Sequence, residues 1–312
     1  MLGAPLSLFS ASAQEGGGGV HGRTAHFSWS SPEDQIARTR PLIETIEKEL
    51  SEISSWLGLP EAPHGKLLWI TSREELNEAL GYKAPSWYAA VTQPSENRII
   101  MVMRAAHSQE QLHKTLRHEL VHWAMQSLGQ KAWEAQPAWV HEGLAEVWAE
   151  QRLLSGMRVS LSWPAFRNEL PYLGDFDAGF GGDPYFAAQG YALAHAFFAR
   201  LERIYGRELV AQLMQKIRSG KSLDRALLDL TKEGLVDHEQ ALRQELGSLS
   251  RLLSDFYPQF FLFVTLFLTL GFPLAMRRRR RKHQVLAKKW DEEDERLDVE
   301  GGGSDDMWRN IS

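Results

Sequence analysis

Apolar residues three or four positions apart predict a long amphipathic helix near the start of the chain. The spacing is carried by Ile43, Ile46, Leu50, Ile53 and Leu57. Gly58 and Pro60 follow, and such residues end helices, so the helix is expected to stop there. Ser31 and Pro32 are typical of a helix cap and first turn, and Pro41 suggests a break or kink before the apolar run.

After this helix the pattern changes to short apolar runs, which predict the strands of a small sheet. One strand is expected at residues 67–70, and residues 87–92 and 98–103 are expected to form a hairpin. Ser72 and Glu75 have the spacing of a capping box, so a helix should separate the first strand from the hairpin. Residues 98–103 directly precede the next helix. They are either a plain hairpin edge or an edge on which an extended peptide pairs.

Helical patterns dominate the chain from residue 108 to residue 253. Ser108 and Gln111 form a second capping box, which opens a helix that should end near Gly129. Further helices are expected at residues 137–146, 185–205, 208–219, 223–229 and 237–253. Residues 170–184 are rich in Gly, Pro and Asp and predict a long loop. A small sheet followed by many helices predicts an α+β domain, here residues 31–254.

Residues 256–276 are an uncharged apolar run, which predicts a transmembrane helix. Such a helix would be about 30 Å long, the thickness of a bilayer core. Six basic residues, 277–282, follow at once, and basic flanks stay in the cytoplasm. The pattern predicts a single-pass protein of a bacterial cytoplasmic membrane, with the N-terminal domain outside and the C-terminus inside. A buried core helix is the alternative.

The sequences at the two ends of the chain are interpreted in line with this predicted topology. Residues 1–13 are interpreted as the remnant of a signal peptide, because Ala11-Ser12-Ala13 has the form of a cleavage site although no basic residue precedes it. An unstructured loop of a cytosolic protein is the alternative. Residues 14–30 contain four consecutive glycines and are expected to be a flexible leader. Residues 277–312 change from basic to acidic and are expected to be a disordered cytoplasmic tail.

Charge and cysteine content narrow the classes of function. The net charge of -5 does not indicate a nucleic-acid partner. The chain has no cysteine, which excludes disulfides, thiol catalysis and thiolate metal sites.

The stretch His118-Glu119-Leu120-Val121-His122 carries the clearest candidate chemistry. On a helix, residues four apart share a face, so His118 and His122 can direct ring nitrogens at one ion. Glu119 can then reach a water at that ion and act as a general base without being a ligand. Buried structural histidines are the alternative interpretation.

A third protein ligand is needed for a catalytic zinc, and the segment 137–146 can supply it. Glu142 follows His122 by twenty residues, and Glu146 lies one helical turn later. On a helix the two share a face, so one can bind zinc while the other orients a ligand histidine. His141 directly precedes Glu142, and neighbours on a helix point about 100° apart, so His141 is not expected to share the ion.

These residues carry a resemblance to a known family. HELVH followed by WVHEGLAE resembles the gluzincin branch of zinc peptidases, and most of all the bacterial peptidase MA-like domains. The resemblance implies a zincin-like fold, zinc bound by His118, His122 and Glu142, Glu119 as the base, and Glu146 as support for a zinc-binding histidine. It also implies a peptide or protein substrate. The G-x-M-E-N segment of M1 aminopeptidases is missing, so an aminopeptidase is not implied.

In the same family a helix that often contains Gln before Gly-Tyr packs over the zinc site, and this chain has Gln189-Gly190-Tyr191. Tyr191 is therefore the first candidate for a donor to the oxyanion, with Tyr185 and His195 in reserve. A packing role is the alternative for each.

The prediction is a membrane-anchored zinc metallopeptidase with its catalytic domain outside the cell membrane. The alternative is an inactive zinc-binding domain that serves as a membrane-tethered interaction module. Glu119 favours the enzyme, because a structural site gains nothing from a base and tends to have four protein ligands.

Overall fold

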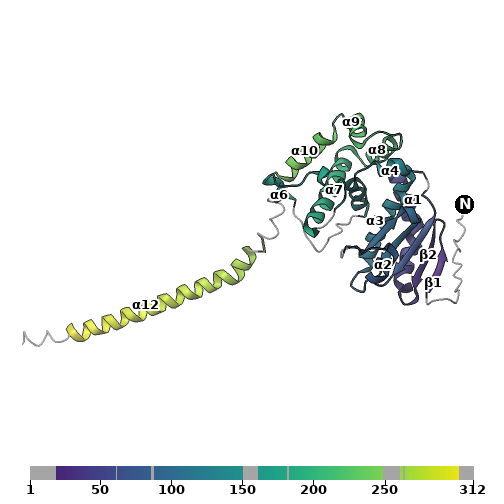
Figure 1. Cartoon of the computed structure of the whole chain (residues 1–312). Coiled ribbons are helices and arrows are strands. Elements are labelled where there is room, and N and C mark those ends of the chain that lie inside the picture. Colours follow the sequence, from purple (N-terminus) through teal and green to yellow (C-terminus); the bar gives the residue numbers. More distant parts are fainter. Residues whose placement is uncertain are drawn as a thin grey trace, which may run out of the picture. The chain divides into compact units, whose positions relative to one another are not determined.

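The chain forms two compact units, residues 1–249 and residues 250–312, and each is described by itself. A computed structural model describes residues 19–60, 62–85, 88–149, 161–180, 183–248, 261–262 and 264–301 (Figure 1). The predicted signal remnant at residues 1–13 lies outside these residues. The first unit is an α+β domain with a small sheet and mostly helices, as the sequence predicts.

The sheet has five strands in the order β1-β2-β3-β5-β4. Their bounds are β1 Gly19–Arg23, β2 Phe27–Pro32, β3 Gly65–Ile70, β4 Ala90–Gln93 and β5 Arg98–Val102. β2, β3 and β5 run parallel, and β1 and β4 pair antiparallel at the two edges. The hairpin prediction is confirmed in β4 and β5. However, β5 is an inner strand, so the edge beside the next helix is β4.

Alternating side chains along the inner strands serve two separate cores. Ile99 and Met101 belong to the main core, which the sheet shares with most helices. Ile100 and Val102 point to the other face and pack with Leu76 in a smaller cluster. The inner strand β5 is therefore buried on both faces, which fits its parallel pairing with β3.

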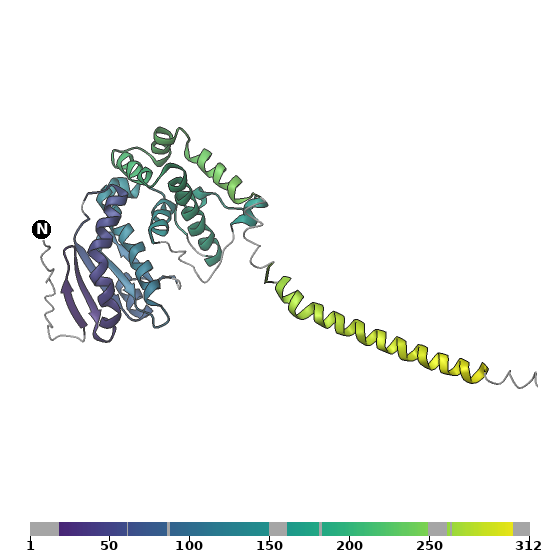
Figure 2. The ribbon, with the colours of Figure 1, turned by 180° about the vertical axis from the view of Figure 1, so that it is seen from behind.

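The helices follow the predicted order closely (Figure 2). In the first unit they are α1 Ile36–Leu57, α2 Arg73–Leu80, α3 Gln109–Met125, α4 Gln130–Glu134, α5 Ala138–Ala149, α6 Ser162–Phe166, α7 Pro184–Tyr205, α8 Glu208–Arg218, α9 Leu223–Thr231 and α10 Leu235–Leu246. α3 packs against α1 and α5, and α5 packs against α7. The predicted loop at residues 170–184 contains only a short 3-10 turn, Leu173–Phe176, among its described residues.

The cap predictions are confirmed at three helix ends. Ser108 and Gln111 form the full capping box of α3. The Ser72 hydroxyl accepts a hydrogen bond of 3.1 Å from the backbone N–H of Glu75 at the start of α2. Gly58 ends α1 in the left-handed conformation, with φ 61°, which glycine adopts without steric cost.

The start of the chain differs from the prediction. The expected leader forms β1 and β2 from residue 19 onward, because alternate side chains of β2 are buried. Ser31 is therefore a buried strand residue, and its hydroxyl accepts a hydrogen bond from Thr39 instead of capping a helix. Pro41 lies inside α1, which continues to Leu57. The long buried face of α1 stabilises the helix through this position.

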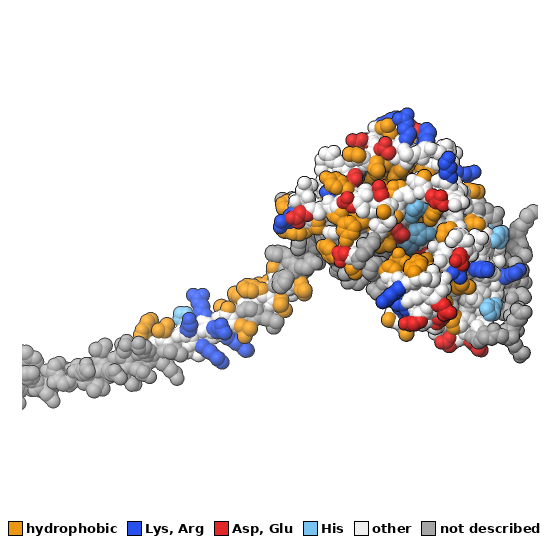
Figure 3. Space-filling view, in the orientation of Figure 1, with side chains coloured by type: hydrophobic (Ala, Val, Ile, Leu, Met, Phe, Trp, Pro, Cys, Tyr) orange, Lys and Arg blue, Asp and Glu red, His pale blue; other side chains and the backbone are white. Residues whose placement is uncertain are grey.

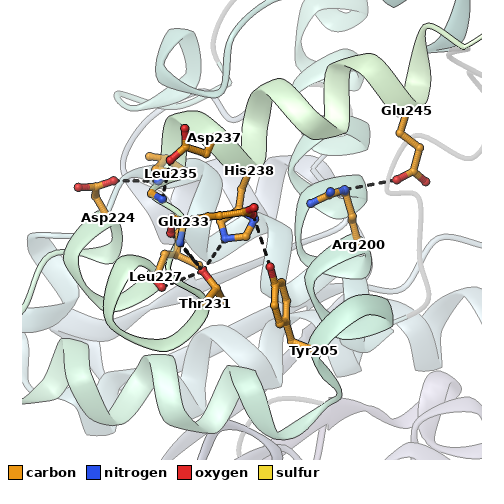
Figure 4. Close-up of polar contacts among 11 residues, drawn as sticks. Arg200, Tyr205, Asp224, Leu227, Thr231, Glu233, Leu235, Asp237, His238 and Glu245 are labelled. Carbon is orange, nitrogen blue, oxygen red and sulfur yellow. Dashed lines mark hydrogen bonds and ion pairs between the residues drawn. The ribbon is translucent and has the colours of Figure 1, made fainter.

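A polar cluster holds together the helices at the C-terminal end of the first unit (Figure 4). His238 on α10 is fully buried, and its Nε2 lies 2.8 Å from the Thr231 hydroxyl at the end of α9. The other ring nitrogen lies 3.4 Å from the Glu233 carboxylate. Tyr205, at the end of α7, donates a hydrogen bond of 3.5 Å to the same carboxylate. The cluster thus links three helices.

The second unit consists of helix in its described part. A π-helical turn, Phe267–Gly271, leads into α12, Phe272–Gly301. Residues 277–301, expected to be part of a disordered tail, are helical in the structure, and this stretch is rich in Arg, Lys and Glu, which favour helix. Residues 256–260 and 263 of the predicted membrane run lie outside the described residues. Within the part that the structure describes, no helix has both the length and the apolarity to cross a bilayer.

Candidate metal centre

His118 and His122 lie on one face of helix α3, and this face points into the domain interior. The Nε2 atoms of the two rings are 3.1 Å apart. His118 is buried and His122 is nearly so, with 12% of its side chain exposed. Two imidazoles that approach this closely with their lone-pair nitrogens are suited to a shared cation.

Helix α5 brings Glu142 to the same point. Its Oε2 atom lies 3.2 Å from the Nε2 of His118 and 3.6 Å from the Nε2 of His122. The candidate ligand atoms of the three residues all lie within 4.8 Å of one another. Among the described residues this is the only such group. The predicted third ligand therefore meets the two histidines.

The three residues fit a zinc ion. Oε2 of Glu142 is buried and has no hydrogen-bond partner in good geometry. A buried carboxylate oxygen without a donor is costly unless a cation compensates it. Two imidazole nitrogens and one carboxylate oxygen are a common ligand set of catalytic zinc, which keeps its fourth position open.

The charges of the group are strongly coupled. Burial raises the pKa of Glu142, but the charge of His122 and the close contacts with the rings of His118 and His122 outweigh it, so the pKa is lowered. Burial lowers the pKa of His122, but the charges of Glu142 and Glu119 together raise it by more, so the pKa of His122 is raised overall. The opposite shifts show that Glu142 and His122 each favour the charged form of the other. A metal ion that binds here must compete with a proton, as metal ions do at histidine sites.

Close packing between α5 and α7 requires glycine at position 143. A Cβ atom on Gly143 would lie 2.7 Å from the Phe198 ring and 2.8 Å from the backbone oxygen of Ala194. The glycine after Glu142 therefore lets α7 lie directly against the helix that carries the ligand.

Glu119, the predicted base, is buried beside the centre. Its Oε2 accepts a hydrogen bond of 2.6 Å from the hydroxyl of Thr92 on the edge strand β4. The same hydroxyl lies 3.3 Å from the backbone oxygen of Glu119. The sequence analysis missed Thr92, because no local signal connects a strand threonine with a helix that begins seventeen residues later in the chain.

Glu146 is buried one turn after Glu142. Its Oε1 lies 3.7 Å from the Nδ1 of His118, on the opposite side of the ring from the metal-facing nitrogen. A carboxylate in this position favours a proton on Nδ1, which leaves Nε2 free to bind a metal. The location agrees with the predicted supporting position.

A pocket of about 350 Å³ opens beside the group. Its lining comes from β4 and the segment before it, from α3, α4 and α5, and from α7. The lining residues are Tyr82, Tyr88, Ala89, Ala90, Val91, Thr92, Pro94, Thr115, His118, Glu119, His122, Trp133, Ala138, His141, Glu142 and Tyr191. Figure 3 shows histidine and acidic side chains together on one face of the first unit, with hydrophobic side chains around them.

Three tyrosines line this pocket, and two of them, Tyr88 and Tyr191, have a raised pKa. Tyr191 stacks on Phe180 with ring centres 4.2 Å apart. Burial, followed by the nearby Glu142, raises the pKa of Tyr191 well above its ordinary value. Tyr88, which the sequence analysis missed, has its pKa raised by the same two causes. Both hydroxyls therefore remain protonated hydrogen-bond donors at neutral pH.

The two reserve residues for the donor are not among the pocket-lining side chains. The side chain of Tyr185 is 51% exposed. His195 is half-buried on α7. The structure therefore brings Tyr191, but neither reserve residue, to the pocket.

His141 also lines the pocket, although it is not in the three-residue ligand group. Its ring packs against Trp133 on α4 with centres 3.8 Å apart. Burial, and then the charge of His122, lower the pKa of His141 to about 4. This contact was not predicted, because no local sequence pattern connects Trp133 with His141.

Comparison with known proteins agrees with this geometry. The sequence model of one protein family, described as Peptidase MA superfamily, matches residues 63–242, which is more than half of the chain. The match begins just before β3 and includes every residue of the candidate centre. No curated protein matches the chain. The chain belongs to the Peptidase MA superfamily.

Proposed function

We propose that the protein is a zinc metallopeptidase of the gluzincin type. The observation that supports this most is the convergence of His118, His122 and Glu142 within 4.8 Å, with the buried carboxylate of Glu119 beside them. A structural zinc site tends to have four protein ligands and needs no neighbouring base. Three ligands and a base fit hydrolysis better.

The residues of the chain have distinct parts in the proposed reaction. Zinc, held by His118, His122 and Glu142, would supply Lewis-acid chemistry that acidifies a water molecule and polarises the scissile carbonyl. Glu119 accepts the proton of the attacking water and then delivers it to the leaving amine. The hydrogen bond from Thr92 holds the Glu119 carboxylate in a single orientation.

We assign oxyanion stabilisation to Tyr191, with Tyr88 as the second candidate. Both line the pocket, and the raised pKa of each keeps its hydroxyl proton available. A donor that meets negative charge developing in the transition state accelerates the reaction. Because the two residues come from different elements, α7 and the segment before β4, single variants can separate their contributions.

The edge strand β4 is the proposed support for the peptide main chain. Among the described strands it pairs only with β5, and its residues from Ala90 to Thr92 line the pocket. An extended peptide can add to such an edge through backbone hydrogen bonds with little dependence on its sequence. This moves the predicted peptide-binding edge from β5 to β4.

Metal analysis and peptide cleavage test the proposal together. The purified chain should contain about one zinc per molecule and cleave members of a mixed peptide library, and a chelator should abolish cleavage until zinc is restored. Glu119→Gln should keep zinc but lose cleavage, because an amide cannot accept the proton. Glu110→Gln on the exposed first turn of the same helix is the matched control and should behave as wild type. Zinc binding without any cleavage by the wild type would favour the inactive interaction module instead.

We also propose that residues 256–276 anchor the protein in a bacterial cytoplasmic membrane. The described apolar side chains in this stretch are largely exposed, including Phe261, Leu266 and Phe272, and six exposed basic residues follow at 277–282. Apolar surface of this kind favours lipid contact, and a basic flank favours the cytoplasmic side. Protease added to intact spheroplasts should then digest the peptidase domain and spare the tail. Digestion of the tail alone would reverse the orientation.

A further inference from the structure

A wall of two packed rings lies next to the candidate metal centre. Trp133 on α4 and His141 on α5 pack with ring centres 3.8 Å apart and an angle of 47° between their planes. The Trp133 ring also meets His122 edge-on, with centres 6.4 Å apart. Since His122 belongs to the candidate ligand group, Trp133 contacts a ring that would itself bind the ion.

The two rings are exposed to different degrees. His141 is 9% exposed, whereas Trp133 is only partly buried, and both line the pocket. Trp133 can therefore offer ring surface to a bound molecule, while His141 supports it from within the domain. The short helix α4 and helix α5 thus add a surface that binding a metal does not require.

The rest of the lining is aromatic or small. Tyr82, Tyr88 and Tyr191 add three further rings. Among the described lining residues there is no Lys, Arg or Asp, and the two carboxylates, Glu119 and Glu142, belong to the catalytic group. An acidic substrate side chain would therefore find no Lys or Arg partner among the described lining residues. An aromatic side chain can pack edge-to-face or offset against Trp133.

We propose that Trp133 and His141 form a subsite for an aromatic side chain of the substrate next to the scissile bond. This inference rests on the proposed peptidase function. The pocket volume of about 350 Å³ lies at the small end of the range for ligand pockets. Such a size suits the residues around one peptide bond, so a single side chain beside that bond is selected.

Matched peptides that differ only in one residue beside the cleaved bond test the subsite. With Phe, Leu, Ala, Lys and Glu at that position, wild type should have a kcat/KM for the Phe peptide about tenfold above that for the Ala peptide, the size of one additional aromatic pair. Trp133→Ala should bring this ratio close to one. Trp133→Phe should keep most of it, because a ring remains. Trp163→Ala, a change at a 46% exposed tryptophan on α6 outside the pocket, is the control and should keep the full ratio.

The His141 variants separate packing from chemistry. His141→Phe keeps a ring behind Trp133 and should keep the preference, whereas His141→Ala should weaken it. Zinc content and melting temperature of each variant show whether it is folded and loaded. An unchanged Phe-to-Ala ratio in Trp133→Ala would overturn the proposal, and so would a wild-type preference for the Lys peptide, which would indicate a cation held by ring faces.

Binding to zinc-loaded Glu119→Gln, measured by calorimetry, distinguishes failure of this inference from failure of the peptidase function. Tighter binding of the Phe peptide than of the Ala peptide, lost in the double variant with Trp133→Ala, supports the subsite even if wild type cleaves nothing. Cleavage by wild type without any preference for Phe leaves the peptidase standing and removes the subsite.

Discussion

The first unit contains two clusters in which a buried histidine contacts a glutamate, and the polar atoms of the two clusters are arranged differently. At the candidate metal centre, the Nε2 atoms of His118 and His122 and the Oε2 of Glu142 approach a single point. In the cluster around His238, the two ring nitrogens face different partners, Thr231 and Glu233. The same residue types therefore form a cation site in one place and a link between helices in the other.

The two clusters also differ in how the chain assembles them. Thr231, Glu233 and His238 lie within eight positions of one another, and the carboxylate of Glu233 is half exposed. The metal centre joins two helices whose ligands are twenty residues apart, and it buries an oxygen of Glu142 that has no hydrogen-bond partner. Convergence of ligand atoms on one point, and not residue composition, distinguishes the candidate binding site from the structural contact.

Alanine at one histidine of each cluster gives the largest expected contrast. His122→Ala should lower zinc affinity by more than about a hundredfold. Removal of a residue that only supports a metal ligand lowers the affinity by up to about a hundredfold, and removal of the ligand itself should lower it more. Cleavage should fall together with zinc affinity. His238→Ala should keep zinc and cleavage but lower the free energy of unfolding by about 1–3 kcal/mol, because a buried hydrogen-bonded side chain is removed. Metal analysis, peptide cleavage and denaturant unfolding measure the three quantities. Retention of full zinc stoichiometry by His122→Ala would remove it from the ligand set.

Zinc itself should stabilise the domain through the candidate metal centre and not through the cluster around His238. Free zinc at about 1,000 times its Kd adds about 4 kcal/mol to the folded state, or roughly 10 °C in Tm for a domain of this size. The shift should disappear in Glu142→Ala and remain complete in His238→Ala. Thermal unfolding with zinc and with a chelator provides the measurement. An equal shift in wild type and Glu142→Ala would place the ion elsewhere.

A smaller effect is expected at the tyrosine above the metal centre. If the Tyr191 hydroxyl stabilises the oxyanion, Tyr191→Phe should lower kcat about a hundredfold, or about 3 kcal/mol, with zinc content and KM unchanged. Tyr205→Phe is the matched change in the His238 cluster. It removes one exposed hydrogen bond to Glu233 and should leave kcat unaltered. Activity of Tyr191→Phe within a fewfold of wild type would transfer the test to Tyr88→Phe.

The smallest effect is a pH dependence of stability from the second cluster. Burial lowers the pKa of His238, the carboxylates of Glu233 and Asp237 oppose this, and the charge of Arg200 adds to it. The unfolded histidine takes up its proton near pH 6.5, before the folded one does. The unfolded state therefore binds more protons below that pH, and stability falls as pH decreases from about 7 toward the lowered pKa.

Substitution of His238 tests this dependence. His238→Gln should show a smaller decrease in Tm between pH 7.5 and pH 5.5 than wild type. His21→Gln, at an exposed histidine in β1, is the control and should keep the wild-type decrease. Because the metal centre is unaltered in both variants, its own titration cancels in the comparison. Identical pH profiles for wild type and His238→Gln would show that His238 does not contribute.

Local patterns in the sequence predicted much of the candidate centre. The four-residue spacing of His118 and His122, and the helix around Glu142, follow from helical periodicity, and the structure places the three residues together. The capping boxes and Gly58 mark helix ends through contacts within a few residues. Such features are determined locally, since hydrogen bonds and side-chain spacing inside one helix depend little on the rest of the chain.

The order of the strands was decided by the tertiary structure alone. The sequence predicted the hairpin but not that β5 would be inside the sheet and β4 at its edge. It also missed β1 and β2, because β2 is held by pairing with β3, which is distant in the sequence, and β1 by pairing with β2. Thr92 meets Glu119, and Trp133 meets His141, for the same reason. The sequence by itself thus determined which residues can bind a metal, whereas long-range packing decided which strand, hydroxyl and ring lie beside them, because these contacts join segments that no local periodicity connects.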